Sequence, residues 1–291
     1  MNKEKFKESE LILNSDGSVY HLKLRGEHVA DTVLLVGDQN RVAMISKYFD
    51  SVEFQTQNRE FITHTGYIGK TRLTVLSTGI GTDNIDIVVN ELDAAINIDP
   101  DSRTKKEELK SLNLIRIGTS GALQEDIPVG SPVISSYGLG FDGLLHFYNY
   151  SPEEETKALQ QEILDHLQWN PLLSQPYLVK ASTPLFEQIG RGMFEGITAT
   201  ASGFYGPQGR QLRLKASREN INEQLNTFRS EKHRITNFEM ETSALFGLGS
   251  LLGHQCATCC AIVANRMRKE YAKDHHAPIE SLIKTVLERI S

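Results

Sequence analysis

The sequence predicts a three-layer α/β fold in which helices flank a central mixed β-sheet. Short apolar runs of strand length alternate with amphipathic segments along the chain of 291 residues, as in domains with a largely parallel or mixed sheet. Because no repeat, low-complexity tract or flexible linker divides the chain, residues 1–291 are predicted to form a single domain. Its 39% hydrophobic and 23% charged residues are ordinary for a globular protein.

Composition argues against several classes of protein. A net charge of −6 disfavours broad nucleic-acid binding, which needs a basic face, although a local arginine cluster can still hold a phosphate-sized anion. Because the chain has neither an apolar signal-peptide core nor a run of ~18 apolar residues, we expect a cytoplasmic protein that does not span a membrane. Cys256, Cys259 and Cys260 are expected to be structural thiols, since a zinc site needs a fourth ligand at suitable spacing and His254 is too close.

The chain begins with a predicted polar N-terminal tail, residues 1–18. The apolar run Thr32–Val36 predicts a strand that leads into Gly37 and a helix with Arg41 in its first turn. A helix N-terminus beside an arginine suits an anion. A plain helix-capping turn with a solvated arginine fits the local sequence equally well.

A strand pair and a helix follow. The pair is Phe61–Tyr67 and Arg72–Ser77, joined at a Gly-Lys turn. Thr78–Asp83 then leads into a helix whose apolar residues recur on one face: Ile85, Val88, Val89, Leu92 and Ile96. The charged stretch of residues 99–111 is predicted to be a solvated loop or a short helix.

The central strand is predicted over Asn113–Ile117, with Arg116 near its end. Gly118–Gly121 then predicts a turn made of small residues. In open α/β sheets, ligands bind beyond the carboxyl ends of strands, and a guanidinium there can hold an oxyanion through two hydrogen bonds. An ordinary tight turn, with Arg116 paired to a carboxylate, fits this segment as well.

The next elements are a strand and a helix. Pro132–Ser136 predicts the strand, and the helix is expected from Ser151, its N-cap, to about Trp169. Between them, Gly138–Gly143 matches GxGxxG, but aromatic residues follow where a dinucleotide fingerprint needs a helix. A nicotinamide site is therefore not favoured.

The last part of the chain predicts the strands Tyr177–Ser182 and Gly196–Ser202, separated by a short mobile segment. A loop over Phe204–Arg210 turns at Gly-Pro and offers an amide and a guanidinium. The remaining elements are a helix capped by Ser217, a helix that follows Phe238–Thr242 and ends at Gly253, a strand over Gln255–Ala264, and an amphipathic C-terminal helix.

Five segments in this order, VGDQNR, NREF, STGIG, RIGTSGA and FEMET, resemble the nucleoside phosphorylase superfamily. The loop FYGPQGR resembles the uridine phosphorylase branch, and FDGLLHF matches as well. The similarity runs from about His21 to Arg266, nearly the whole chain. Each motif alone is weak, whereas the ordered set is specific.

The resemblance implies a role for each matching residue. Phosphate would be bound by Gly37, Arg41, Arg59, Arg116 and Thr119, with Arg59 reaching a neighbouring subunit. Ribose would be bound by His21, also from a neighbouring subunit, and by Thr119, Met240 and Glu241. The base would be bound by Phe204, Gln208 and Arg210. Catalysis would depend on Arg116, Glu241, Gln208 and Arg210.

The implied activity is phosphorolysis of uridine to uracil and ribose 1-phosphate, with inorganic phosphate as cosubstrate and no cofactor. The resemblance leaves open whether 2′-deoxyuridine and thymidine are used. It implies a homodimer with shared active sites, and the choice between dimer and hexamer stays open.

Two departures from known bacterial members bear on these expectations. Thr82–Ile85 replaces a Gly-Pro-Ser-Thr segment, which puts in doubt a monovalent cation that those members bind with a Glu matching Glu60. The stretch of residues 99–111 is also longer than in those relatives.

Other functions remain as alternatives. A purine nucleoside phosphorylase on the same fold would want an Asp soon after the last strand, where this chain has Asn265-Arg266. A nucleosidase would have no need of three phosphate-directed arginines. A non-catalytic nucleoside-binding protein would need no cosubstrate site.

Overall fold

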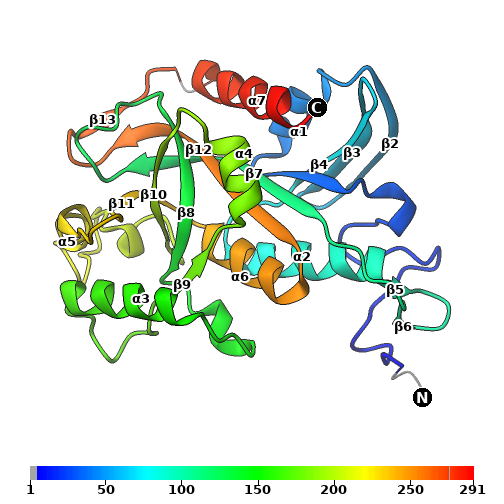
Figure 1. Cartoon of the computed structure of the whole chain (residues 1–291), viewed down its shortest axis with the longest axis horizontal. Helices are drawn as coiled ribbons and strands as arrows, with labels where there is room; N and C mark the ends of the chain where they lie inside the picture. The colour runs from blue at the N-terminus through cyan, green and yellow to red at the C-terminus, as the bar shows by residue number, and fades with distance from the viewer. Residues whose placement is uncertain (1–4, 275) are drawn as a thin grey trace.

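The computed structural model describes residues 5–274 and 276–291. Helices lie on both sides of a twisted mixed sheet, which confirms the predicted fold class (Figure 1). The strands are β1 (Thr32–Val36), β2 (Ser51–Asn58), β3 (Phe61–Ile68), β4 (Thr71–Ser77), β5 (Ile98–Asp99), β6 (Thr104–Lys105), β7 (Asn113–Ala122), β8 (Pro132–Gly140), β9 (Tyr177–Lys180), β10 (Phe194–Thr200), β11 (Ile235–Glu239), β12 (Gln255–Asn265) and β13 (Glu270–Tyr271).

The helices that cover the sheet are α1 (Gln39–Ser46), α2 (Thr82–Asn97), α3 (Glu154–Leu167), α4 (Thr183–Gly190), α5 (Ile221–Thr227), α6 (Thr242–Leu252) and α7 (His276–Ile290). Short 3₁₀ turns are η1 (Gly26–His28), η2 (Leu144–Phe147) and η3 (Gly206–Gln208). Within the described residues, none of the helices is long and apolar enough to cross a membrane.

The first half of the sheet has the strand order β7-β1-β4-β3-β2, and β1 is parallel to both of its neighbours, β7 and β4. Val36 is level with Ser77 on β4, and Leu35 is level with Arg116 on β7. The carboxyl ends of β1 and β4 therefore form an edge beside the middle of β7, which continues to Ala122. Gly37 lies at this edge, and Arg116 lies next to it on β7.

The second half of the sheet closes into a ring. Strand β7 pairs with β12, β12 with β8, β8 with β10, β10 with β11, and β11 returns to β7. The prediction that Gly118–Gly121 turns the chain is wrong, because each of these residues pairs with β12 and Gly121 also pairs with Phe238 on β11. Closing the ring keeps the small residues extended.

Apolar faces on both sides of the sheet hold the layers together. Helices α1, α4 and α7 pack on one face through residues such as Ile45, Leu185 and Ile283. Helices α2 and α6 pack on the opposite face through residues such as Val89 and Leu245, and α3 and α5 cover the ring. In Figure 1, α7 and α1 lie above the sheet, and α2, α3 and α6 lie below it.

Several predicted boundaries need correction. Helix α3 begins at Glu154 after the N-cap Glu153, so Ser151 lies before the helix. The segment predicted to be mobile forms α4, and α5 starts after Asn220 rather than at a Ser217 cap. Strands β2 and β11 were not predicted.

The charged stretch of residues 99–111 contributes to the small hairpin of β5 and β6 rather than to a helix. Arg103, which has a left-handed φ of 56°, donates from its side chain to the carbonyl oxygens of Phe6, Lys7 and Leu11. The N-terminal segment is therefore held against this hairpin, with the Leu11 side chain buried.

Candidate active site

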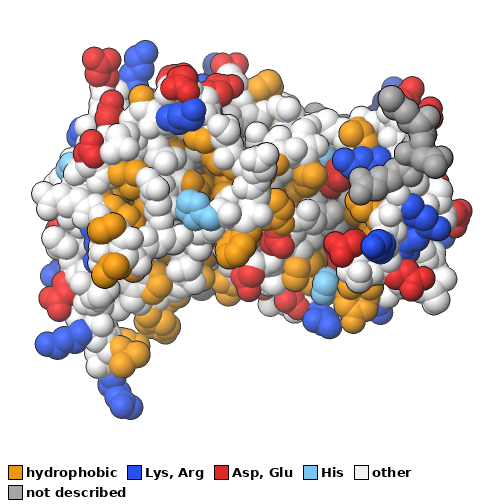
Figure 2. Space-filling model, turned by 90° about the horizontal axis from the view of Figure 1, so that it is seen from below, with side chains coloured by type: hydrophobic (Ala, Val, Ile, Leu, Met, Phe, Trp, Pro, Cys, Tyr) orange, Lys and Arg blue, Asp and Glu red, His pale blue; other side chains and the backbone are white. Residues whose placement is uncertain are grey.

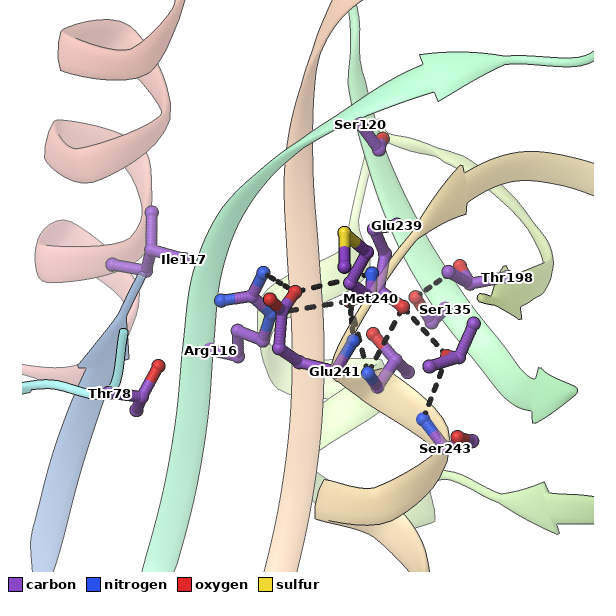
Figure 3. Close-up of polar contacts among 12 residues, drawn as sticks. Thr78, Arg116, Ile117, Ser120, Ser135, Thr198, Glu239, Met240, Glu241 and Ser243 are labelled. Atoms are coloured by element: carbon purple, nitrogen blue, oxygen red, sulfur yellow. Dashed lines mark hydrogen bonds and ion pairs between the residues drawn. The ribbon is translucent and has the colours of Figure 1, made fainter. Parts of the chain in front are cut away.

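Arg116 lies at the centre of a buried cluster of charges. Its Nη2 donates to the Glu241 carboxylate, and its Nε donates to Glu239 Oε2 at 3.3 Å (Figure 3). All three side chains are at most 5% exposed. Of the two sequence-based interpretations of Arg116, the pairing with a carboxylate is present, whereas the binding of an oxyanion stays a prediction.

The charged groups of the cluster shift one another's pKa values, and burial acts on all of them. Burial opposes the charge of Arg116, but Glu241 and Glu239 outweigh it and raise the Arg116 pKa above its ordinary value. Burial raises the pKa of Glu241, against the lowering effect of the Arg116 guanidinium. Arg41 is 8% exposed, and its pKa is lowered by burial and then by the charge of Arg116.

Glu239 ends β11 and holds the start of α6, and Glu241 lies between the two elements. Glu239 accepts the backbone N–H groups of Glu241 and Thr242 at 3.0 Å and the Thr200 hydroxyl at 2.7 Å. This carboxylate therefore complements the helix dipole. Glu241 turns the other way, and its Oε1 accepts the Gly81 N–H at 2.9 Å. Glu239 was missed as a site residue, although it is the first acid of FEMET and the sequence therefore displayed it.

Two glycines leave room for the arginines. A Cβ on Gly118 would lie 3.0 Å from Cys260 Sγ and 3.2 Å from Arg116 Cζ. A Cβ on Gly37 would lie 3.9 Å from Arg116 Nη1, a buried atom with no hydrogen-bond partner in the described part of the chain. Arg41 Nη1 donates to the Ile117 carbonyl at 3.2 Å. Two cationic side chains thus converge on this edge, one of them with an unused donor.

The loop after β10 forms a second group of side chains. The Arg210 guanidinium lies 3.7 Å from the centre of the Phe204 ring, and its Nη1 donates to Gln208 Oε1 at 2.5 Å. Gln208 is 3% exposed. Burial, together with the positive charge of Arg266, lowers the pKa of Arg210 to about 10, so the group stays charged at neutral pH.

Arg266 links this loop to β7. Its backbone N–H donates to Ala122 O at 2.9 Å, and its Nη2 donates to Gln208 O at 3.0 Å. Sequence reasoning named the position but gave it no role, because its partners lie far away along the chain. Thr119 and Met240, also predicted as site residues, are half-buried on β7 and just after β11.

His21 and Arg59 are not part of the Arg116 cluster. The polar contacts of the His21 side chain run to Glu91 on α2. Arg59 is exposed at the turn between β2 and β3, with a φ of 53°. The two residues are close to each other, because the Asn58 amide donates to the His21 carbonyl at 2.8 Å. The predicted site thus divides into one buried part and one surface part.

The three cysteines are structural thiols as expected, whereas the monovalent cation that the sequence put in doubt is not tested. Cys256, Cys259 and Cys260 are buried and unbridged, and burial raises the pKa of Cys260 to about 12. No group of three or more His, Cys, Asp and Glu residues in the described ranges could hold a metal ion. Whether Glu60 helps to bind a monovalent cation stays open.

A family model described as the phosphorylase superfamily matches residues 31–290. The chain belongs to the phosphorylase superfamily. As a member it is a nucleoside phosphorylase, a pentosyltransferase that takes a nucleoside and phosphate as substrates. The resemblance seen in the sequence is thereby confirmed.

Known members of the superfamily match the chain over almost its whole length. The uridine phosphorylase of Thermococcus kodakarensis is 30% identical, over 93% of this chain and 86% of its own. A crystal structure of a Trypanosoma brucei nucleoside phosphorylase, described as showing uridine phosphorylase activity, is 28% identical with a TM-score of 0.88, over 96% of this chain and 99% of its own. A DeoD-type purine nucleoside phosphorylase of Buchnera aphidicola is 22% identical, over 94% of this chain and 99% of its own.

Proposed function

We propose that this protein is a uridine phosphorylase. In the reaction the C1′–N1 bond of uridine breaks, an oxygen of hydrogen phosphate bonds to C1′, and the departing uracil takes at N1 the proton that the phosphate gives up. Ribose passes through an oxocarbenium-like state while negative charge gathers on the base. The residues needed would therefore hold an anion, grip the sugar and stabilise the base.

Phosphate would bind at the sheet edge formed by β1, β4 and β7. The residues assigned to it are Gly37, Arg41, Arg116 and Thr119, with Arg59 of a second subunit. The unused Arg116 Nη1, which faces Gly37, supports the assignment because a buried donor without a partner costs free energy that an oxyanion would recover. Holding the dianion beside C1′ also supplies proximity.

Ribose would lie against Thr119, Met240 and Glu241, with His21 of the second subunit at its 5′ end. The Glu241 carboxylate is fixed between Arg116 and the Gly81 N–H. A carboxylate held in this way can accept the 2′- and 3′-hydroxyls and favour the positive charge that develops on the sugar. Arg116, which touches both carboxylates, would connect the sugar subsite with the phosphate subsite.

The loop of Phe204–Arg210, called the base loop below, is the main support for uridine as the substrate. Gln208 offers one donor and one acceptor, as uracil requires for its oxygens and its N3–H, and the adjoining Arg210 can donate where charge develops on the base. Phe204 would lie beside the base ring. The chain runs Arg-Met-Arg-Lys directly after β12, so Arg266 stands there with a positive charge instead of an acid, and this favours a pyrimidine over a purine that needs protonation at N7. The uridine phosphorylases among the relatives agree with this choice.

We also propose a homodimer with shared sites. Three exposed apolar side chains, Ile80, Tyr20 and Phe147, lie near α2. Ile80 comes shortly before the helix in the sequence. Tyr20 and Phe147 each precede a residue that contacts the helix, since His21 contacts Glu91 and the Tyr148 hydroxyl bonds to Asp86. Figure 2, which views the molecule from below, shows apolar side chains over the left and middle of this face. Such a surface would suit a second copy of the chain. Further assembly to a hexamer stays open.

A nucleoside panel with and without phosphate tests the proposal. Uridine, 2′-deoxyuridine, thymidine, cytidine, inosine and adenosine would be incubated with the protein, and the free bases would be separated by chromatography. We expect uracil to be released from uridine only when phosphate is present. Release at the same rate without phosphate would identify a nucleosidase, and preference for inosine would identify a purine enzyme.

A further inference from the structure

Glu91 receives an unusual share of hydrogen bonds from one short segment. Its carboxylate accepts the His21 N–H at 2.9 Å, the Leu22 N–H at 2.8 Å and the His21 ring at Nδ1, 2.5 Å from Oε1. The Glu91 side chain is 17% exposed and that of His21 is 25% exposed. One carboxylate on α2 therefore holds the backbone and the ring of the same histidine.

The segment around His21 is anchored on both sides of the histidine, whose ring stays partly exposed. Val19 and Leu22 are buried in the core beneath α2. The Asn58 amide holds the His21 carbonyl, and the Phe61 ring meets the imidazole edge-on with 6.4 Å between ring centroids. Because Asn58 precedes Arg59 directly, the histidine and the exposed arginine occupy one patch of the surface.

The contact with Glu91 decides which ring nitrogen is available. A carboxylate only accepts hydrogen bonds, so Nδ1 must carry a proton to make the contact. In a neutral ring Nε2 is then left as an acceptor, and it is available to a hydroxyl that approaches from outside. A carboxylate that orients a histidine and fixes its tautomer is a known device of metal and catalytic sites.

The histidine cannot serve the site of its own subunit. Helix α2 starts after Gly81, whose N–H bonds to Glu241, and Glu91 lies ten residues further along the helix. At 1.5 Å per residue this is a separation of ~15 Å, which exceeds the span of one ribose. The ring would therefore act on a nucleoside bound to another copy of the chain.

We propose that Glu91 is a positioning residue, which holds His21 with Nδ1 protonated so that Nε2 accepts the 5′-hydroxyl of a nucleoside in the partner's site. The inference rests on the proposed function, which assigns His21 to the 5′ end of ribose. It adds that the chain selects 5′-hydroxyl nucleosides over 5′-deoxynucleosides, and that this selection depends on a residue that does not touch the substrate.

The test compares uridine with 5′-deoxyuridine, measured as kcat/KM in saturating phosphate. Wild-type protein should prefer uridine by about tenfold, the factor expected from one hydrogen bond. In Glu91→Gln an amide nitrogen faces N–H donors, so the preference should fall to about unity while the rate with 5′-deoxyuridine stays unchanged. That unchanged rate also shows that the variant is folded.

Two further variants separate positioning from a structural role. The double variant Glu91→Gln/His21→Ala should behave as His21→Ala alone does, since Glu91 acts only through the histidine. Glu91→Asp, which keeps the carboxylate but shortens its reach, should retain part of the preference, and it replaces Glu91→Gln if that variant does not fold.

Equal losses for both substrates in the Glu91 variants would overturn the proposal and make Glu91 a structural residue. An unchanged preference, or no preference in the wild type, would overturn it as well. A failure of the base assignment looks different, because uridine itself would then not be cleaved. In that case the same comparison is made with inosine and 5′-deoxyinosine.

Discussion

Arg116 and Glu241 form an ion pair that is almost fully buried, and Glu239 holds the same guanidinium from the side. A buried pair of this kind contributes little net stability, whereas removal of one partner leaves an uncompensated charge and is costly. The pair therefore makes the predicted phosphate and ribose subsites depend on each other.

Arg116→Ala should lower the free energy of unfolding by ~3–5 kcal/mol and should nearly abolish phosphorolysis. Adding Glu241→Gln should restore part of the stability and none of the activity, because one of the unpaired charges is removed. Urea unfolding and initial rates measure the two effects. Full stability in Arg116→Ala would show that the pair is not buried in solution.

The stability deficit of Arg116→Ala should also depend on pH. Burial already raises the pKa of Glu241, and loss of the guanidinium removes the charge that opposes this rise. The folded variant then binds the proton more tightly than the unfolded chain, so its deficit is largest at high pH and shrinks as the pH falls toward the unfolded pKa. Unfolding in urea at about pH 8 and about pH 5 should show the smaller deficit at the lower pH. A deficit that grows on acidification would contradict this explanation.

Gly118→Ala tests whether the strand leaves room for the guanidinium. The new Cβ would press on Cys260 Sγ and on Arg116 Cζ, and Arg116 would have to move away from Glu241. We expect a loss of activity of at least tenfold together with lower thermal stability. Cys260→Ala in the same chain removes the sulfur contact and should recover stability but not activity. Recovery of both stability and activity would show that the new Cβ clashes only with the Cys260 sulfur and leaves Arg116 in place.

The sequence predicted the parts of this site that local patterns encode. An arginine near the end of an apolar strand made Arg116 a candidate, and a glycine before a helix with an arginine in its first turn did the same for Gly37 and Arg41. A tight turn and a solvated arginine fitted these two segments equally well, so the family resemblance was needed to choose. Local pattern also predicted β1, β3 and β4, since each has an apolar run and a turn at its end, but it did not predict β2.

Features that depend on distant partners were not predictable in this way. Gly118–Gly121 has the composition of a turn and becomes a strand because β12 and β11 pair with it. Arg266 and Glu91 acquire their roles from contacts to Gln208 and His21, which a single sequence does not display. For the same reason the family resemblance supplied site residues that periodicity and spacing did not.

Arg59 provides the test for a site shared between subunits. Arg59→Ala and Glu241→Gln should each be nearly inactive as homo-oligomers. When the two are refolded together they should regain activity, because some mixed dimers carry one intact site. Lys70→Ala, an exposed lysine at the turn between β3 and β4, is the matched control and should be fully active. If mass measurement confirms mixing and no activity returns, Arg59 does not act in the partner's site.

The base loop gives the prediction that bears most directly on the substrate. A site whose buried polar groups match one base rejects others that leave those groups unpaired, by ~10⁴ in favourable cases. Cytidine should fail with this loop, because its N3 and its 4-amino group invert the hydrogen-bonding pattern of uracil. Uridine should therefore be cleaved far faster than cytidine, inosine or adenosine.

Arg210→Ala should lower kcat/KM for uridine by at least ~10², since charge stabilisation in a site that excludes water is worth about 3 kcal/mol. The KM for phosphate should stay nearly unchanged, because the Arg210 guanidinium contacts Phe204 and Gln208 rather than the Arg116 cluster. Arg213→Ala removes an exposed arginine from the same loop and should leave both constants unaltered. Normal turnover of uridine by Arg210→Ala would remove the uridine assignment and leave the membership in the phosphorylase superfamily intact.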